Sequence, residues 1–158
     1  MIDDSKIIVL NPKADSNTED KLGKTFQQFD ALLKELRKRA LPANVIEAIN
    51  RGIGEINSSA LTGTDLRKEI KKHQTSILKL LEKELKLVTK NHYRTLWMIL
   101  GMSVFGIPIG VFIGSLKENM GLLGIGLPIG MAIGLGVGVM LDKKAIKEDR
   151  QLDVEIKY

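Results

Sequence analysis

Few side chains in this sequence could carry out chemistry, and they do not form a recognisable catalytic or metal-binding set. The two histidines, His73 and His92, are nineteen residues apart, and neither has a carboxylate or another histidine at metal-ligand spacing on the same face. The chain has no cysteine, which excludes thiolate nucleophiles, disulfides and cysteine metal sites. We therefore interpret both histidines as ordinary surface residues and expect no catalytic residue and no metal site.

A glycine-rich run, Gly134-Leu135-Gly136-Val137-Gly138, resembles a nucleotide-binding loop in its letters only. Such a loop needs a preceding strand and a following Lys-Ser/Thr pair, and this run has neither and lies inside an apolar stretch. We expect no bound cofactor, and we interpret the protein as a non-enzyme.

Two uncharged stretches dominate the second half of the chain, and the glycine-rich run lies inside the second of them. Residues 95–116 and 120–141 each hold twenty-two consecutive uncharged residues. As helices they would each be about 33 Å long, which matches a hydrocarbon core of about 30 Å. A pair of buried helices in a soluble protein is the alternative, but nothing else in the chain could cover two helices that are apolar all round. We predict an all-α membrane protein with a two-helix antiparallel transmembrane hairpin, turning at residues 117–119.

The remaining segments suggest a cytoplasmic helical region and two short ends. We expect residues 1–16 to be flexible or a short strand, 17–94 to be a cytoplasmic basic helical region, 95–141 the hairpin, and 142–158 a cytoplasmic charged tail. Lysine and arginine flank the outer ends of both spans, and only Lys117 lies in the turn, so the positive-inside rule places both termini in the cytoplasm. The residues expected at lipid headgroups are Lys83, Lys86, Lys90, Arg94, Lys143 and Lys144.

Helical spacing predicts about three helices before the membrane. A capping box at Ser16–Glu19 starts a helix over 17–40 that Pro42 ends, and a shorter helix follows near 45–56. From Asp65 no glycine or proline occurs until Gly101, so the third helix could run into the bilayer as one rod. The β-prone ends, 6–10 and 152–158, could pair as strands within or between chains, or the tail could be disordered.

Glycine recurs at every fourth residue in both spans, which places it on one face of each helix. In lipid no hydrophobic drive joins helices, so such a face favours close backbone packing. We interpret these positions as helix-packing residues: Gly106, Gly110, Gly114, Gly126, Gly130, Gly134 and Gly138.

The two spans are also inverted copies of each other. GIPIGVFIGSL (106–116) and GLPIGMAIGLG (126–136) share six of eleven positions, and a fold about Glu118 sets Gly110 opposite Gly126 and Gly106 opposite Gly130. Pro108 and Pro128 are each expected to kink their helix near mid-membrane, because proline removes a backbone donor. Inverted repeats with interrupted helices also occur at transporter sites, but neither span has an ionisable residue.

The region 101–152, with its glycine spacing and the exit LDKKAIKEDRQL, resembles a group of small, mostly uncharacterised bacterial glycine-zipper membrane proteins. The matching exit positions are Asp142, Lys143, Lys144, Arg150, Gln151 and Leu152. Asp149 stands where that pattern has a glycine, which would imply a backbone turn. The resemblance covers about a third of the chain, and it implies a two-span architecture and a bacterial inner membrane but no activity.

These observations lead to a non-enzymatic scaffold or interaction protein that associates through its glycine faces, as a homo-oligomer or with another membrane protein. A homo-oligomeric pore or small-solute channel is the alternative. Residues 67–94 hold nine Lys/Arg against three Glu, which favours contact with anionic lipid headgroups and leaves open a lipid-sensing regulator. Nucleic acid is not expected as a partner, because stacking aromatics and binding motifs are missing.

Overall fold

The computed structural model describes residues 6–12 and 21–156. The chain divides into two compact units, the first formed by Met1–Val88 with Leu152–Tyr158 and the second by Thr89–Gln151. The second unit is therefore an insertion within the sequence of the first. This division differs from the four consecutive segments expected, because residues from the charged tail belong with the N-terminal helical region.

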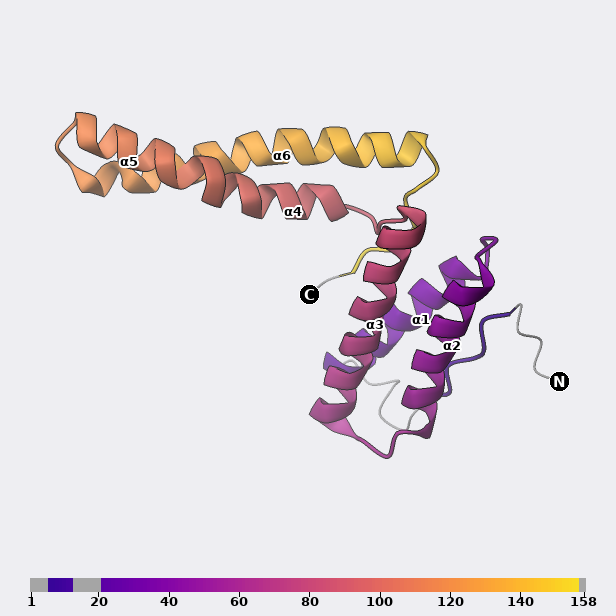
Figure 1. Ribbon diagram of the computed structural model, residues 1–158. Helices are drawn as coiled ribbons and strands as arrows, with labels where there is room; N and C mark the ends of the chain where they lie inside the picture. Colours follow the sequence, from indigo (N-terminus) through magenta and orange to yellow (C-terminus); the bar gives the residue numbers. More distant parts are fainter. Residues whose placement is uncertain (1–5, 13–20, 157–158) are drawn as a thin grey trace. The chain divides into compact units, whose positions relative to one another are not determined.

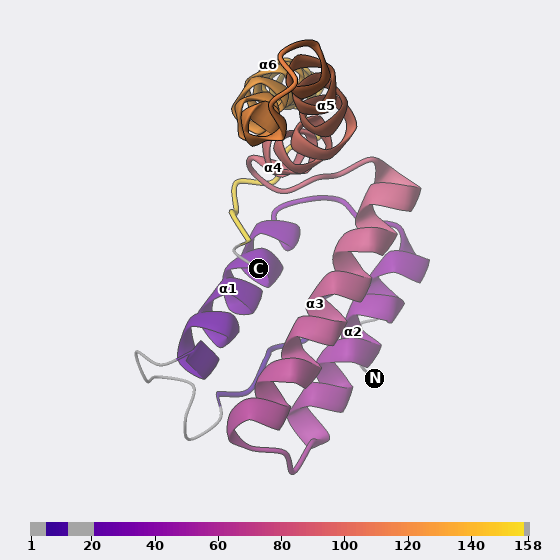
Figure 2. The ribbon, with the colours of Figure 1, turned by 90° about the vertical axis from the view of Figure 1, so that its left-hand side faces the viewer.

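Three helices form unit 1: α1 (Lys21–Leu36), α2 (Ala43–Ser58) and α3 (Gly63–Leu85). Each presents an apolar stripe at helical spacing, and the stripes meet in one core. Helices α1 and α2 each lie beside α3 (Figure 2). Representative fully buried side chains are Phe29 and Leu33 in α1, Ile49 and Ile53 in α2, and Ile70 in α3. The three predicted helices are present.

The first helix is shorter at its C-terminus than predicted. It ends at Leu36, and the chain tightens into a turn in which the Arg39 N–H donates to the Leu36 carbonyl. Pro42 does not end this helix as predicted but is the N-cap of α2. Its carbonyl accepts hydrogen bonds from the N–H groups of Val45 and Ile46. The predicted capping box at Ser16–Glu19 lies outside the described residues.

The prediction of one continuous rod from Asp65 into the membrane is wrong, because α3 ends at Leu85. Lys86 adopts a left-handed conformation with φ of 57°, and the Leu87 N–H donates back to the Leu81 carbonyl. Leu87 and Val88 are then buried in extended chain, and Asn91 provides a second left-handed residue with φ of 58°. Burial of the two apolar side chains outweighs the cost of a left-handed lysine. The sequence has no glycine or proline here that would have indicated the end of the helix.

The terminal segments do not pair with each other as strands in the described part of the chain. Residues 7–12 have no regular secondary structure and lie against α1 and α2, with Ile7 and Leu10 buried in the core. At the other end, Leu152 is fully buried and its N–H donates to the Val88 carbonyl at 2.8 Å. The C-terminal segment up to Ile156 is thus part of the folded core of unit 1 and is no free tail.

His73 departs from the expected surface position, because α3 packs it against α2. A Cβ added to Gly52 would lie 3.2 Å from the His73 Nδ1 atom, and the His73 Nε2 atom lies 3.3 Å from a Glu55 carboxylate oxygen. The side chain is 13% exposed. Glycine at position 52 makes room for the imidazole, so His73 is a helix-packing residue.

Unit 2 is a helical hairpin. Its first arm consists of α4 (His92–Gly101), the π-helical segment η1 (Met102–Gly106) and α5 (Ile107–Leu116). After a turn and the short 3₁₀ segment η2 (Met120–Leu122), α6 (Leu123–Lys147) returns antiparallel to the first arm (Figure 1). The turn is closed by the Asn119 N–H, which donates to the Gly114 carbonyl at 2.9 Å, with Glu118 left-handed at φ of 48°.

Candidate functional site: the apolar helical hairpin

The predicted helix-packing glycines lie at the contact between the two arms of the hairpin. A Cβ added to Gly126 would lie 2.6 Å from the Gly110 Cα, and one added to Gly130 would lie 2.5 Å from the Gly106 Cα. Both distances are shorter than any side chain tolerates, so only glycine allows this approach. The structure therefore brings together the two glycine pairs that the inverted repeat predicts.

Gly101 continues the same contact and was missed by the four-residue spacing. A Cβ on Gly134 would lie 3.0 Å from the Gly101 Cα, yet Gly101 precedes Gly106 by five residues. The π-helical segment η1 absorbs the extra residue, since its wider turn returns a residue to the same face after about five positions instead of four. A five-residue gap between glycines, followed by a proline, was the available sequence signal.

Pro108 accounts for the position of the π-helical segment. Proline cannot donate to the carbonyl four residues earlier, and its ring crowds that carbonyl, which here belongs to Val104. Val104 lies within η1, where the wider turn relieves the crowding. Pro128, the inverted counterpart, lies inside α6, which continues as α-helix on both sides of it. The two halves of the repeat are therefore not equivalent in backbone structure.

At the open end of the hairpin, the glycine face meets a larger residue. A Cβ on Gly138 would lie 2.6 Å from the Arg94 Cα, so the first turn of α4 also packs on backbone. Gly114, near the turn, is buried in α5. All seven predicted packing glycines are thus buried, and those at the arm contact face the opposite arm.

The outer surface of the hairpin is covered by large apolar side chains. Phe112 is 65% exposed, Val104 56% and Met140 72%. Others of the same kind are Leu96, Ile99, Leu100, Phe105, Ile107, Val111, Leu116, Ile125, Ile129, Ile133 and Val139. Small residues therefore point inward and large apolar ones outward, which is the reverse of a water-soluble helix pair.

Asp142 closes the hairpin by capping α4 from the opposite arm. Its side chain is 7% exposed, and its two oxygens accept the backbone N–H groups of Tyr93 at 3.1 Å and Arg94 at 3.0 Å. These are first-turn donors that α4 cannot satisfy itself, because its N-cap, Asn91, offers no side-chain bond. A carboxylate there also complements the positive end of the helix dipole. Asp142 is the first charged residue after the second apolar run, which was the sequence signal.

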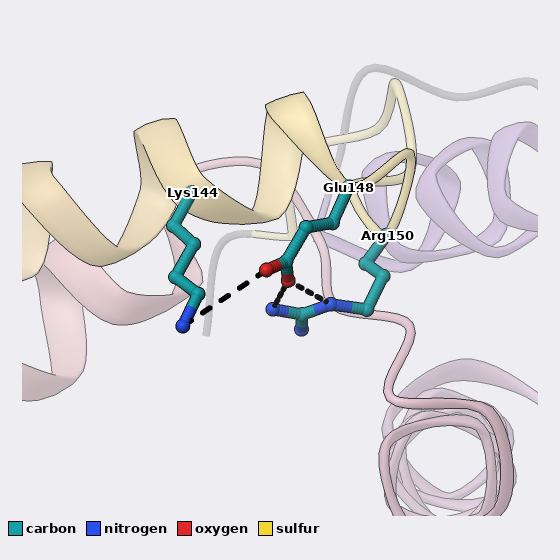
Figure 3. A network of polar contacts seen from close by, with 3 residues as sticks. All are labelled: Lys144, Glu148 and Arg150. Carbon is teal, nitrogen blue, oxygen red and sulfur yellow. Dashed lines mark hydrogen bonds and ion pairs between the residues drawn. The ribbon is translucent and has the colours of Figure 1, made fainter.

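A small ion-pair network ends α6 (Figure 3). The Arg150 Nε donates to Glu148 Oε2 at 2.7 Å, Arg150 Nη2 bonds the same oxygen, and Lys144 Nζ lies 3.9 Å from Glu148 Oε1. Hydrogen bonding to Arg150 lowers the pKa of Glu148, and hydrogen bonds to Glu148 and then Tyr93 raise the pKa of Arg150. The turn between them has Asp149 at φ of 51°, where the resemblance implied glycine.

The six residues predicted at lipid headgroups fall in both units. Lys83 lies in the last turn of α3 and Lys86 caps it, within unit 1. In unit 2, Arg94 lies in the first turn of α4, and Lys143 and Lys144 lie near the end of α6. Lys90 lies in the connection before α4. Within the hairpin, these predicted headgroup residues therefore lie at the end opposite the turn.

The hairpin offers no donor set for a metal ion. The described residues contain no group of three or more His, Asp or Glu side chains able to hold one. Asp142 is engaged by two backbone donors, and His92 makes an edge contact with the Tyr93 ring at 5.0 Å between centroids. The chemistry that the site supports is packing, capping and contact with apolar surroundings.

Comparison with protein-family models, with curated proteins and with solved structures finds no match to this chain. The resemblance to small glycine-zipper proteins thus stays a prediction. The structure itself defines an all-helical protein with two candidate membrane-spanning helices, His92–Leu116 and Leu123–Lys147, each 25 residues long and apolar enough to cross a bilayer.

Proposed function

We propose that the protein is a non-enzymatic membrane scaffold, in which the hairpin crosses a lipid bilayer and unit 1 is held at the aqueous surface to bind a protein partner. The observation that carries the proposal is the inside-out distribution of side chains on the hairpin: glycines between the arms and large apolar side chains outside. Exposure of that large apolar surface to water is unfavourable, whereas lipid tails solvate it.

The connections between the units support one side of the membrane for both ends of the hairpin. The chain leaves unit 1 after Val88 and re-enters it at Leu152, and these two residues are hydrogen-bonded to each other. A hairpin whose two ends join neighbouring backbone must enter and leave the bilayer at one surface. The lysine and arginine bias then assigns that surface to the cytoplasm, which for a bacterial chain is the inner face of the inner membrane.

The glycine faces cannot simultaneously serve a partner and the hairpin. Because they already pack one arm on the other, a partner that used them would have to separate the arms. Association with another copy or another membrane protein therefore uses the outer apolar surface or unit 1. This also disfavours the pore alternative, because the outer surface presents no ring of polar or charged side chains to line a path.

Anionic lipid headgroups complete the proposed environment. Arg94, Lys143 and Lys144 lie at the open end of the hairpin, where a cytoplasmic leaflet would meet it. Basic residues near such a surface each gain about 1 kcal/mol from anionic lipid. Reversing these three charges should lower the yield of insertion into vesicles that contain phosphatidylglycerol and leave insertion into neutral vesicles unchanged.

Reconstitution of the full chain into vesicles tests the proposal. We expect the protein to float with the vesicles after an alkaline carbonate wash. Single cysteines introduced at Ser59 and at Asn119 should react with an impermeant thiol reagent from opposite sides. Release by carbonate, or labelling of both cysteines from one side, would contradict the spanning hairpin. A purification in mild detergent that yields only the single chain, with no partner crosslinked in cells, would contradict the scaffold.

A further inference from the structure

The N-terminal segment of unit 1 is held mainly through its backbone, by side chains of the helix beside it. The Asn50 side chain accepts the Ile8 N–H at 2.9 Å and donates to the Lys6 carbonyl at 3.0 Å. The Asn57 side chain repeats this pattern with the Asn11 N–H at 2.8 Å and the Val9 carbonyl at 3.0 Å. Each side-chain amide thus bonds one backbone N–H and one backbone carbonyl of the segment, as a neighbouring strand would.

The spacing of the two asparagines fits the repeat of an extended peptide. They are seven residues apart on α2, which is about 10.5 Å along the helix axis. The backbone groups that they bind are three residues apart on the segment, which spans about 9–10 Å of extended chain. The register of helix and segment therefore agrees over two contacts.

Two further features complete a binding surface. The Arg37 guanidinium, at the end of α1, donates to the Ile8 carbonyl at 2.7 Å and to the Ile7 carbonyl at 3.4 Å. Ile7 and Leu10, again three residues apart, point into the core and are nearly fully buried, while Val9 between them is 69% exposed. The surface thus selects an extended chain with apolar residues at positions i and i+3.

We propose that this surface, formed by Arg37, Asn50 and Asn57 over the apolar core, is a peptide-binding site whose ligand is residues 6–11 of a second copy of this chain, in exchange with the chain's own segment. The contacts are the same whether the segment comes from the same or another copy. The balance between the two therefore depends mainly on the concentration of other copies relative to the effective concentration of the chain's own segment. The ten residue steps from Asn11 to Lys21, where α1 begins, could span at most about 33–36 Å by length alone.

A second copy is the occupant that the observations favour, because every copy carries a segment of the required chemistry. Confinement of copies to one membrane surface would raise the concentration of competing segments. The inference goes beyond the proposed function, since exchange requires only unit 1 and would occur in detergent as well as in a membrane. Failure of membrane insertion would therefore leave it standing, and its own failure would leave the scaffold standing.

Because the chain contains no cysteine, crosslinking between full-length copies tests exchange directly. One preparation carries Val9→Cys, and a second, with a different mass tag, carries Gly54→Cys. Gly54 lies between Asn50 and Asn57 on the same helical face, and a Cβ there would meet nothing within 4 Å. After mixing, a short bifunctional thiol reagent should join the two tags. An excess of the synthetic peptide KIIVLNP should reduce that product.

A complementing pair makes the result independent of the chain's own segment. The acceptor, Gly54→Cys, also carries Ile7→Asn and Leu10→Asn, which disable its own segment. The donor, Val9→Cys, carries Asn50→Ala and Asn57→Ala, which disable its own surface. We expect more mixed crosslink from this pair than from the two chains that carry only the cysteines. We expect none when the donor also carries Ile7→Asn and Leu10→Asn.

A matched substitution distinguishes recognition from general loosening. Adding Asn57→Ala to the acceptor removes two backbone contacts and should lower the mixed crosslink about tenfold. Arg51→Ala, at an exposed position on the same helix, should leave it unchanged. If the mixed preparations give no joint product while a single chain carrying both cysteines crosslinks within itself, the segment is a fixed part of one chain and the proposal is wrong. If circular dichroism shows that the acceptor has lost helix, the pair that carries only Val9→Cys and Gly54→Cys is used instead. Its mixed crosslink is judged by the same criterion.

Discussion

Single polar side chains decide several local features of this protein, and Asp142 is the clearest of them. It is buried, it accepts two first-turn N–H groups of α4, and it comes from the far end of the other arm. A capping residue usually precedes its own helix. Here the cap comes from forty-nine residues later, so it couples the start of one arm of the hairpin to the end of the other.

Replacement of Asp142 tests that coupling. We expect Asp142→Ala to destabilise the open end of the hairpin by about 0.5–2 kcal/mol, the range for loss of a helix cap, and Asp142→Asn to cost less because one acceptor remains. Faster hydrogen exchange at the Tyr93 and Arg94 amides would report it. Lys143→Ala, at an exposed neighbouring position, is the control, and equal effects from both variants would contradict the capping role.

Glu35 makes the docking of the C-terminal segment dependent on pH. Its pKa is lowered from 4.5, chiefly by a hydrogen bond from Lys38, and the Asp153 N–H also donates to it at 3.4 Å. A carboxylate with a lowered pKa stabilises the folded state fully above its unfolded pKa, and that contribution is lost as pH falls through the folded value.

We therefore expect the Asp153 amide to shift in a nuclear magnetic resonance titration with a midpoint below pH 4.5. Glu35→Gln, which does not titrate, should remove the part of that shift that comes from Glu35 and leave the part that comes from the Asp153 carboxyl itself. Lys38→Met should raise the midpoint, because it removes the largest cause of the lowered pKa. An Asp153 amide with the same titration in the parent chain and in Glu35→Gln would show that the contact with Glu35 is not maintained in solution.

At the scale of helices, the arm contact is set by glycine positions rather than by glycine content. Gly124 and Gly136 lie in the same helix as Gly130, yet a Cβ on either of them would meet nothing within 4 Å. The hairpin thus contains its own matched controls. The π-helical segment matters for the same reason, since without it Gly101 would leave the contact face.

Alanine substitutions separate the two kinds of glycine. Gly130→Ala would force a Cβ against the backbone of Gly101 and Gly106, and we expect a destabilisation of about 1–3 kcal/mol, as for overpacking. Gly136→Ala should be neutral or stabilising by up to about 1 kcal/mol, because alanine favours helix. Unfolding in sodium dodecyl sulfate, followed by the fluorescence of Trp97, the single tryptophan, measures both. Identical midpoints for the two variants would contradict the arm contact.

For the whole molecule, the insertion of the hairpin between Val88 and Leu152 is the organising feature. The last described residues do not trail from the hairpin but complete the core of unit 1, where Leu152 is fully buried and Val154 nearly so. Unit 1 is therefore attached to the hairpin by two connections that are hydrogen-bonded to each other, which restricts how far either connection can open.

Leu152→Ala tests this closure. We expect it to destabilise unit 1 by about 2–5 kcal/mol, the range for truncation of a buried leucine. Glu155→Ala, three residues on and exposed, should change stability by no more than about 0.5 kcal/mol. Urea unfolding of the detergent-solubilised protein, followed by circular dichroism, compares the two. If Leu152→Ala left the transition unchanged, the C-terminal segment would not belong to the core.

The sequence alone determined the features that depend on local pattern. Two uncharged runs of twenty-two residues specify two long apolar helices, and apolar residues at helical spacing specify α1, α2 and α3. Glycine at every fourth position, together with the inverted repeat, was enough to pair Gly110 with Gly126 and Gly106 with Gly130. Each of these conclusions needs only the period of a helix and the length of a span.

Only the tertiary structure decided the features that depend on contacts between distant residues. The break at Lys86 arises because Leu87 and Val88 are buried, and the fold of the C-terminal end arises because Leu152 fits the same core. Asp142 caps a helix that begins fifty residues earlier, and Asn50 and Asn57 bind a backbone that carries no motif for them. Backbone hydrogen bonds and burial in a shared core do not depend on local residue pattern, so no spacing rule in the sequence could have revealed them.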